Sequence, residues 1–178
     1  QPDGKIVACG YREPQFAIAR YNSDGSLDAS FNSTGTLLTT FGGSDDNGRA
    51  IALDGSGRIV AAGDTPSGVG GDLAVARYQS TGTLDSSFNA SGKATLSLSS
   101  GQDYGFSMVI QANGKLLVGA TKNWADGDMA VARLNADGTV DGGFGIGGSM
   151  TVPIATGDQK GSGLALQSDG RMIFVGTT

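Results

Sequence analysis

The chain repeats itself, and this repeat limits the available folds more than any other feature of the sequence. One segment, FAIARYNSDGSLDASFN from Phe16, returns as LAVARYQSTGTLDSSFN from Leu73 and as MAVARLNADGTVDGGFG from Met129. A second block precedes it each time, as QPDGKIVACG, DGSGRIVAAG and QANGKLLVGA, and a fourth version, QSDGRMIFVG, begins at residue 167. The chain therefore contains a little over three units of 56 or 57 residues, and such a period indicates a repeat architecture.

Each unit contains four short runs that we predict to be β-strands, bounded by turns rich in Gly, Asp and Ser. In the second unit these runs cover residues 50–53, 58–63, 73–78 and 93–98. Four strands in a unit of this length are typical of a propeller blade, so we expect an all-β, propeller-like array of four-stranded antiparallel blades. The expected organisation is a partial blade at 1–43, blades at 44–100 and 101–156, and the start of a further blade at 157–178.

The third strand of each unit favours sheets that are stacked on one another. The run 73–78 alternates Leu, Val and Arg with Ala, Ala and Tyr, so neither of its faces is simply polar. Stacked blades require a sheet that is covered on both faces, and small alanines on one face allow a neighbouring sheet to approach closely. A solenoid of stacked hairpins has a similar period and is the alternative architecture.

The composition argues against several classes of function. The 178 residues include 31 glycines and no histidine, which removes Ser-His and Cys-His nucleophilic pairs and the commonest zinc ligand. A formal net charge of -5 with scattered basic residues gives no footprint for nucleic acid. No run approaches the roughly 18 apolar residues of a membrane helix, so membrane insertion is not expected. The single cysteine, Cys9, lies in the apolar run KIVACG, where a buried small residue is expected.

The segments QPDGKIVACG and FAIARYNSDGSLDASF, together with AIAL, resemble the bacterial delta-60 repeat family, a β-propeller domain of unknown function found in large secreted or surface proteins. The resemblance covers essentially the whole chain. It implies a propeller fold and an extracellular or cell-surface location in a bacterium, and it brings no catalytic residue and no cofactor. The second unit departs most from the pattern, because Gln79 and Thr81 replace the Asn and Asp.

A little over three units are too few to close a propeller ring, because closed propellers have about four to eight blades. We therefore expect either a piece of a larger ring that further repeats of the same parent chain complete, or several molecules that associate. The first is favoured because the chain starts and finishes on the same element of the unit, QPDGKIVACG and QSDGRMIFVG.

The segment ARYNSDGSLD, residues 19–28, has the spaced oxygen side chains of a calcium loop. The three units keep an Arg and, eight residues later, an Asp, whereas the oxygens between them change. A cation would also be repelled by the Arg. We therefore predict structural ion pairs and no metal, with calcium as the alternative. The predicted pairs are Arg20 with Asp28, Arg77 with Asp85, and Arg133 with Asp141.

A second group of acids precedes the first strand of each unit, which is the innermost strand of a propeller blade. Its members are Asp45, Asp46, Asp103 and Asp158. One hypothesis gathers them at a mouth of the central channel as a site for a cation or a polar ligand. The preferred alternative is that they cap turns. Because acids without basic partners repel one another, we expect them at solvated positions.

The loop between the second and third strands of the unit varies most, reading YREPQ, DTPSGVGGD and TKNWADGD in successive units. Variable loops on a repeated scaffold are where binding residues concentrate. An exposed aromatic there can stack on a sugar or anchor a protein partner, and packing against a neighbouring loop is the alternative. The candidate binding residues are Trp124, Tyr11, Arg12 and Asp126.

These features predict a non-catalytic scaffold or adhesion module that recognises a protein or glycan through its loops. One alternative is a structural array in which molecules associate through their terminal blades. The other is a propeller enzyme with a channel site, which the lack of histidine disfavours.

Overall fold

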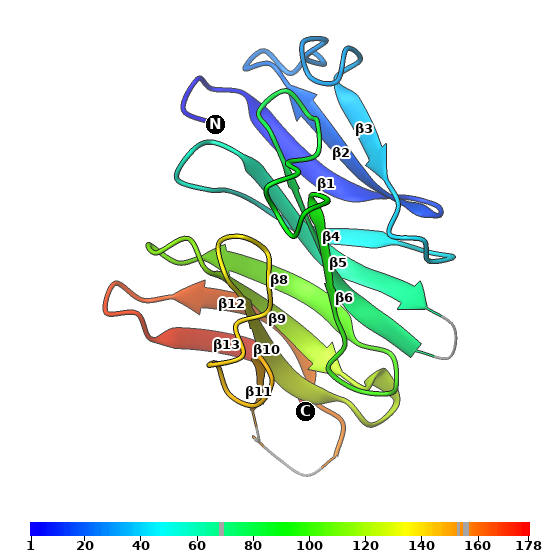
Figure 1. Cartoon of the computed structure of the whole chain (residues 1–178), viewed down its shortest axis with the longest axis vertical. Helices are drawn as coiled ribbons and strands as arrows, with labels where there is room; N and C mark the ends of the chain where they lie inside the picture. The colour runs from blue at the N-terminus through cyan, green and yellow to red at the C-terminus, as the bar shows by residue number, and fades with distance from the viewer. Residues whose placement is uncertain (68–69, 153, 155–156) are drawn as a thin grey trace.

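The computed structural model of the chain describes residues 1–67, 70–152, 154 and 157–178. In this part of the chain the only helix is a short 3-10 turn, η1 (Trp124–Asp126), and all other regular structure is antiparallel β-sheet. The first sheet lies at the top of Figure 1 and the second below it, and the third and last sheets lie next to each other in the lower half. The all-β prediction is confirmed. No described helix has the length and apolar character needed to cross a membrane.

The two central units each form a four-stranded antiparallel sheet, as predicted. The second sheet has the order β4 (Asn47–Leu53), β5 (Ile59–Ser67), β6 (Gly70–Tyr78) and β7 (Lys93–Leu96). The third sheet contains β8 (Tyr104–Ile110), β9 (Leu116–Lys122), β10 (Asp128–Leu134) and β11 (Ser149–Thr151). The first sheet contains β1 (Ile6–Arg12), β2 (Gln15–Tyr21) and β3 (Thr36–Thr39), and the last contains β12 (Lys160–Leu166) and β13 (Met172–Thr177).

Several strands extend further than the sequence indicates. The segment DTPSGVGGD was expected to be a loop, but Thr65 pairs with Asp72 in a hairpin that continues β5 and β6. The inner strands also begin early: β4 starts at Asn47 instead of Ala50, and β12 starts at Lys160 instead of Leu164. Antiparallel pairing with the next strand continues through these segments although they are poor in apolar residues, because backbone hydrogen bonds need no particular side chain.

Apolar side chains fill the spaces between successive sheets. Between the first and second sheets, Phe16 and Ile18 are buried in one cluster with Ala61, Ala74 and Ala76. The opposite face of β6 contributes its Leu and Val to the cluster that joins the second and third sheets. The prediction that this strand is covered on both faces is therefore confirmed, with small residues on one face and larger ones on the other.

The first strands of successive units lie next to one another, since β4 contacts β8 and β8 contacts β12. Two glycines show how closely they approach the preceding sheet. A Cβ atom on Gly48 would lie 2.6 Å from the carbonyl oxygen of Gly10, and one on Gly105 would lie 2.7 Å from that of Gly63. A register irregularity follows each of these glycines, and such a bulge changes the direction of the next side chain.

Candidate functional site

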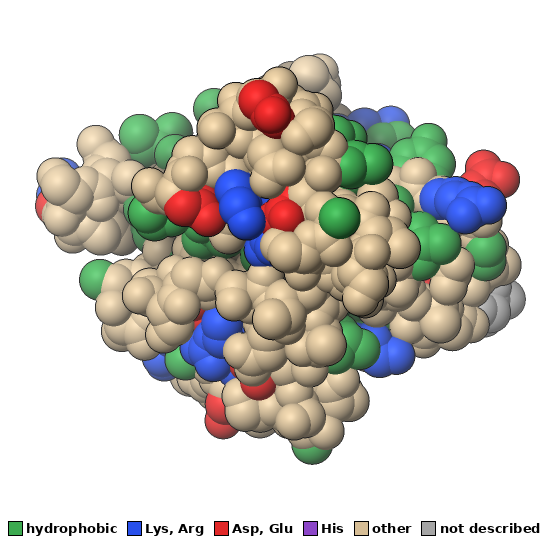
Figure 2. All heavy atoms as spheres, turned by 90° about the horizontal axis from the view of Figure 1, so that it is seen from above, with side chains coloured by type: hydrophobic (Ala, Val, Ile, Leu, Met, Phe, Trp, Pro, Cys, Tyr) green, Lys and Arg blue, Asp and Glu red, His purple; other side chains and the backbone are tan. Residues whose placement is uncertain are grey.

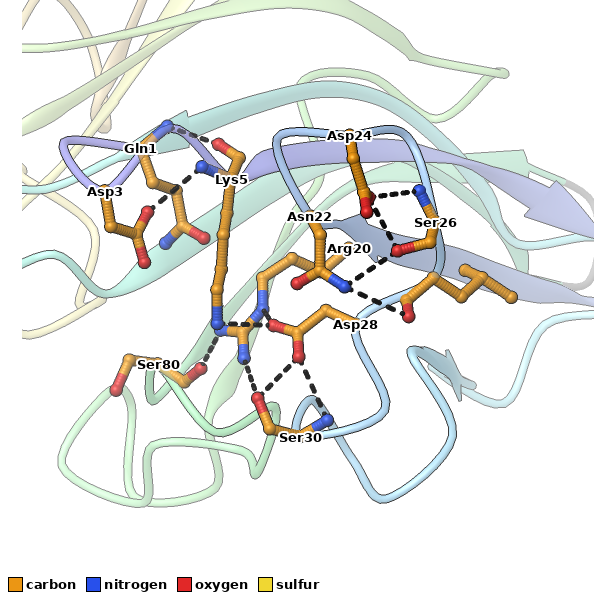
Figure 3. A network of polar contacts seen from close by, with 11 residues as sticks. Gln1, Asp3, Lys5, Arg20, Asn22, Asp24, Ser26, Asp28, Ser30 and Ser80 are labelled. Carbon is orange, nitrogen blue, oxygen red and sulfur yellow. Dashed lines mark hydrogen bonds and ion pairs between the residues drawn. The ribbon is translucent and has the colours of Figure 1, made fainter.

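The first candidate is the polar network around Arg20 and Asp28 (Figure 3). The Asp28 carboxylate accepts hydrogen bonds from Arg20 Nε at 2.6 Å and from Ser30 Oγ at 2.6 Å, and it pairs with Lys5 Nζ at 2.8 Å. Arg20 also donates to the carbonyl of Ser80, which belongs to the second unit. The ion pair therefore closes the β2 turn and connects this turn to the next sheet.

The same arrangement recurs in the other two units. Arg77 Nε lies 2.7 Å from Asp85, and Arg133 Nε lies 2.6 Å from Asp141. A second cation, from the residue just before β1, β5 or β9, approaches each carboxylate, and an aromatic ring lies under each guanidinium. The second cations are Lys5, Arg58 and Lys115, and the rings are those of Phe31, Phe88 and Phe144. We call each Arg–Asp pair with its second cation and its ring a latch.

The latch carboxylates are held in the ionised form. Hydrogen bonds from Lys5 and then from Ser30 lower the pKa of Asp28 well below its usual range. Burial alone would raise the pKa of Asp85, but hydrogen bonds from Ser87 and Arg77 outweigh it and lower that pKa to about 2. In Asp141 the main cause of the lowered pKa is the hydrogen bond from Lys115.

The turn that resembles a calcium loop uses its oxygens internally. Asp24 Oδ1 accepts hydrogen bonds from the backbone and the hydroxyl of Ser26, at 2.9 and 2.7 Å, which caps the turn. Asp28 faces two cationic side chains, which would repel a metal ion. No three Cys, Asp or Glu side chains come together as a metal-binding group in the described residues. This geometry supports the structural interpretation of the segment.

The junction acids do not occupy one common environment. Asp46 and Asp103 are fully buried, so the expectation of solvated positions is wrong for them. Asp46 accepts hydrogen bonds from the backbone of Phe41 at 2.6 Å and from Thr65 Oγ1 at 2.5 Å. Asp103 accepts from Ser99 Oγ at 2.6 Å and from the backbone of Asn123 at 2.9 Å, among others. These donors replace water, and both carboxylates cap the connection between two sheets.

The other two acids are more accessible. Asp45 is half-buried and Asp158 is exposed. In the last unit the position equivalent to Asp103 is occupied by Gln159, whose side chain is buried and accepts a hydrogen bond from the backbone of Ile154 at 3.3 Å. The geometry therefore supports turn capping at these junctions and does not gather the four acids into one channel site among the described residues.

The second candidate surface surrounds Trp124, which is 37% exposed in η1. Its ring centroid lies 4.7 Å from that of Tyr104 and 6.3 Å from that of Phe106, both at tilted angles. Lys160 Nζ lies 3.9 Å from the Trp124 ring centroid. The indole is therefore supported by two rings of β8 and flanked by a cation from β12.

Arg49 of β4 extends this surface on the other side. Its guanidinium carbon lies 5.5 Å from the Tyr104 ring centroid and 5.8 Å from that of Phe106. Arg49 Nε also pairs with Asp64 at 2.5 Å, and burial raises the pKa of Asp64 despite this pairing. Three inner strands and one loop thus contribute to a single cation–aromatic surface. We call it the aromatic surface, consisting of Arg49, Tyr104, Phe106, Trp124 and Lys160.

Sequence reasoning identified only Trp124 in this set. The other members occupy positions that flank the glycine of each inner strand, in the triplets NGR, YGF and KGS from Asn47, Tyr104 and Lys160. The glycine is kept in all three units while its neighbours change. This contrast between a constant and a variable position is the signal in the sequence that could have indicated the surface.

The remaining candidates lie elsewhere on the loops. Tyr11 and Arg12 are exposed at the end of the β1–β2 hairpin, and Asp126 is exposed in η1. Tyr11 and Arg12 occupy the place in the first unit that corresponds to the Trp124 loop. The ring and cation contacts of the aromatic surface in the described structure do not include these three residues.

Stacked four-stranded antiparallel sheets with adjacent inner strands define a β-propeller repeat protein. Residues 1–31, 55–88 and 111–144 match the model of a family described as a domain of unknown function (DUF5122) beta-propeller. Because the matched segments cover more than half of the chain, the chain belongs to this family. They contain all three Arg–Asp pairs, whereas Arg49, Tyr104, Phe106 and Lys160 lie outside them. No match was found among curated proteins.

Proposed function

We propose that this chain is a non-catalytic propeller module that binds a protein or a glycan through the aromatic surface. The observation that carries the proposal is the partly exposed Trp124, held in place by Tyr104 and flanked by Lys160. Rigid, half-exposed aromatic rings stack on sugars and anchor protein partners at low cost in conformational entropy. Flanking cations add hydrogen-bond donors for hydroxyl, carboxylate or carbonyl groups.

The contrast between framework and surface supports this proposal. The latches recur in all three units almost without change. Their charged groups already form ion pairs and hydrogen bonds within and between sheets. The residues of the aromatic surface differ from unit to unit although their backbone positions are equivalent. A constant scaffold that carries variable side chains is the usual arrangement of a recognition surface.

A catalytic role has less support. The chain has no histidine, and the buried carboxylates Asp46 and Asp103 accept several hydrogen bonds from protein donors. The resemblance to delta-60 repeats supports a place in a secreted or surface protein of a bacterium, and we include this location in the proposal.

Trp124 is the only tryptophan, so its fluorescence reports on this surface alone. The wild type and Trp124→Ala are compared by affinity electrophoresis in gels containing cellulose derivatives, xylan, pectin or alginate. We expect at least one polysaccharide to retard the wild type and to shift Trp124 emission, and W124A to lose most of the retardation. Ile146→Ala, which changes an exposed side chain outside the surface, serves as the control.

A second arm tests protein recognition with displayed peptides selected on the wild type and screened on W124A. If no polysaccharide is bound and the selected peptides bind both proteins equally, the proposal is wrong. Thermal unfolding separates binding from structure. A loss of roughly 3–5 kcal/mol in W124A, as for a core aromatic, would assign Trp124 a structural role instead.

A further inference from the structure

A hollow of about 410 Å³ lies between the second and third sheets, at the opposite ends of the inner strands from the aromatic surface. It opens between the turn that joins β4 to β5 and the turn that joins β8 to β9, and these turns follow one another at the left of Figure 1. Both walls belong to four-stranded sheets. Small-molecule pockets have volumes of roughly 300–1,000 Å³, so the space is sufficient for a small ligand. We call it the turn hollow, lined mainly by residues of the segments 53–60 and 110–116.

The floor of the turn hollow is apolar. Val60 and Leu116 line it, and both are buried in the core that joins the second and third sheets. Leu53 and Ile110, which are half-buried, add apolar surface at the walls. An apolar floor beneath a small number of polar groups is the usual composition of a ligand pocket.

Three polar groups of the turn hollow have hydrogen-bonding capacity that the described residues do not use. Gln111 has a buried side-chain oxygen without a hydrogen-bond partner, and its amide nitrogen also makes no bond among the described residues. Arg58 bonds Asp54 through Nε and Asp85 through Nη1, so its Nη2 is left over. The hydroxyl of Ser56 makes no hydrogen bond in the described part of the chain either. A buried polar group without a partner destabilises the fold, so the amide at this position calls for a reason other than folding.

The charges at the turn hollow compensate one another. Arg58 and Arg77 both line it, and their partners are the carboxylates of Asp54 and Asp85. Basic side chains also lie beside acidic ones on the face of the molecule that Figure 2 shows, and most of that face is uncharged. The hollow therefore favours a neutral ligand that both donates and accepts hydrogen bonds.

A second hollow recurs one unit further along the stack. It has a volume of about 300 Å³ and lies between the turn that joins β8 to β9 and the turn that joins β12 to β13. Gln111 and Ala112 line both hollows, and Gln167 takes the place of Gln111 in the last unit. The repeat thus produces this kind of space wherever two successive turns stand side by side.

We infer that the turn hollow binds a neutral sugar ring. A hydroxyl group both donates and accepts hydrogen bonds, so neighbouring hydroxyls of one ring can bond the Gln111 amide, the Ser56 hydroxyl and Arg58 Nη2. The C–H groups of the same ring are apolar and lie on Leu53 and Ile110. The aromatic surface is at the other ends of the inner strands, so this site is independent of the proposed function.

Nuclear magnetic resonance titration of the ¹⁵N-labelled chain tests this inference. The probes are the methyl β-pyranosides of D-glucose, D-galactose and D-mannose, and glucuronate and glucosamine serve as charged analogues. We expect at least one neutral probe to cause saturable shifts at the backbone amides of Gly55, Ser56, Ala112 and Gly114, which line the hollow. The charged analogues should bind more weakly. The inference is wrong if no neutral probe shifts these amides up to about 100 mM, where the free energy of binding becomes negligible.

Two variants separate binding from structure. Ala112→Phe fills the hollow from an exposed position and should abolish the shifts, whereas Ala29→Phe, the same change at an exposed alanine outside the hollow, should bind like the wild type. Gln111→Leu removes an amide that makes no side-chain hydrogen bond among the described residues, so its unfolding in urea should require at least as much denaturant as that of the wild type. Its affinity should nevertheless fall about tenfold, as for the loss of one hydrogen bond. The inference is wrong if A112F keeps the shifts or if Q111L keeps the affinity of the wild type.

Discussion

At the scale of single residues, the latch shows how a charged group is kept inside a stack of sheets. Arg20 and Arg77 are nearly buried, and each finds a carboxylate, an aromatic face and a carbonyl of the next unit. The Arg133 side chain is more exposed, at 23%. The exposure fits the smaller set of bonds in the third unit, where Gly143 replaces the serine that bonds the other two carboxylates.

The latch predicts how stability responds to acid. The folded pKa of Asp85 is about 2, below its unfolded value of about 3.9. A lowered pKa contributes stability above the unfolded pKa, and this stability is lost as pH falls through the folded pKa. We expect Asp85→Asn to be less stable than the wild type at pH 7 and to differ little from it near pH 2. Urea unfolding at several pH values measures the difference.

Comparison with a control removes the contributions of other acids. Asp64 acts in the opposite sense because its pKa is raised, so the difference between variant and wild type is the informative quantity. Asp126→Asn changes an exposed carboxylate outside the latches and should follow the wild type. An equal loss of stability in D85N at pH 7 and near pH 2 would contradict the assignment of this pH dependence to the latch.

The Arg–Asp pairs could be predicted from the sequence because both partners belong to one turn and are separated by a fixed number of residues. The contact of Lys5 with Asp28 could not be predicted, because it depends on the pairing of β1 with β2. The expectation of a solvated position was also wrong for Asp46, because one of its two hydroxyl partners, Thr65, is 19 residues away in the chain. An ion pair within one turn can be inferred from that segment alone, whereas the burial of a side chain depends on which residues the neighbouring strand places beside it.

At the scale of elements, a three-residue segment with glycine at its centre gives each inner strand both its close packing and its variable side chains. The central glycine lets the strand approach the preceding sheet, and its neighbours Arg49, Tyr104, Phe106 and Lys160 contribute to the aromatic surface. The sequence predicted these strands but placed their starts too late, because the segments before them lack an apolar pattern. The aromatic surface lies in part of that unpredicted region, at Arg49 and Lys160, which explains why it was missed.

Gly105 tests the close approach of the inner strands. Its Cβ position lies 2.7 Å from the Gly63 carbonyl oxygen, so Gly105→Ala must displace one of the two backbones. We expect a loss of about 1–3 kcal/mol in the free energy of unfolding, the usual cost of overpacking. Gly55→Ala is the matched control, because its Cβ would meet no atom within 4 Å. Chemical unfolding compares the two, and equal effects would show that Gly105 is not constrained by packing.

At the scale of the whole molecule, successive sheets bury apolar side chains against one another in shared cores. The period and the double-sided pattern of the third strand were enough to predict this stacking. The partners that meet across the inner strands could not be predicted, since Arg49, Tyr104 and Lys160 come from three different units. Their proximity depends on how successive sheets are rotated and spaced, and no single unit contains that information.

Stacking also predicts a gradient of local stability along the chain. The third sheet has four strands and is covered on both faces, by cores shared with the second and last sheets. The last sheet has two strands, and its outer face exposes Ile173 and Val175. In a linear stack, opening an end unit breaks one interface, whereas opening an inner unit breaks two.

In dilute solution we therefore expect backbone amides of β13 to exchange with solvent faster than those of β9 and β10, measured by hydrogen exchange and mass spectrometry. Val131→Ala should speed exchange in both sheets, because its side chain belongs to the core that joins them. Uniform exchange across β9, β10 and β13 would mean that the stack opens only as a whole and that end units are not independently weaker.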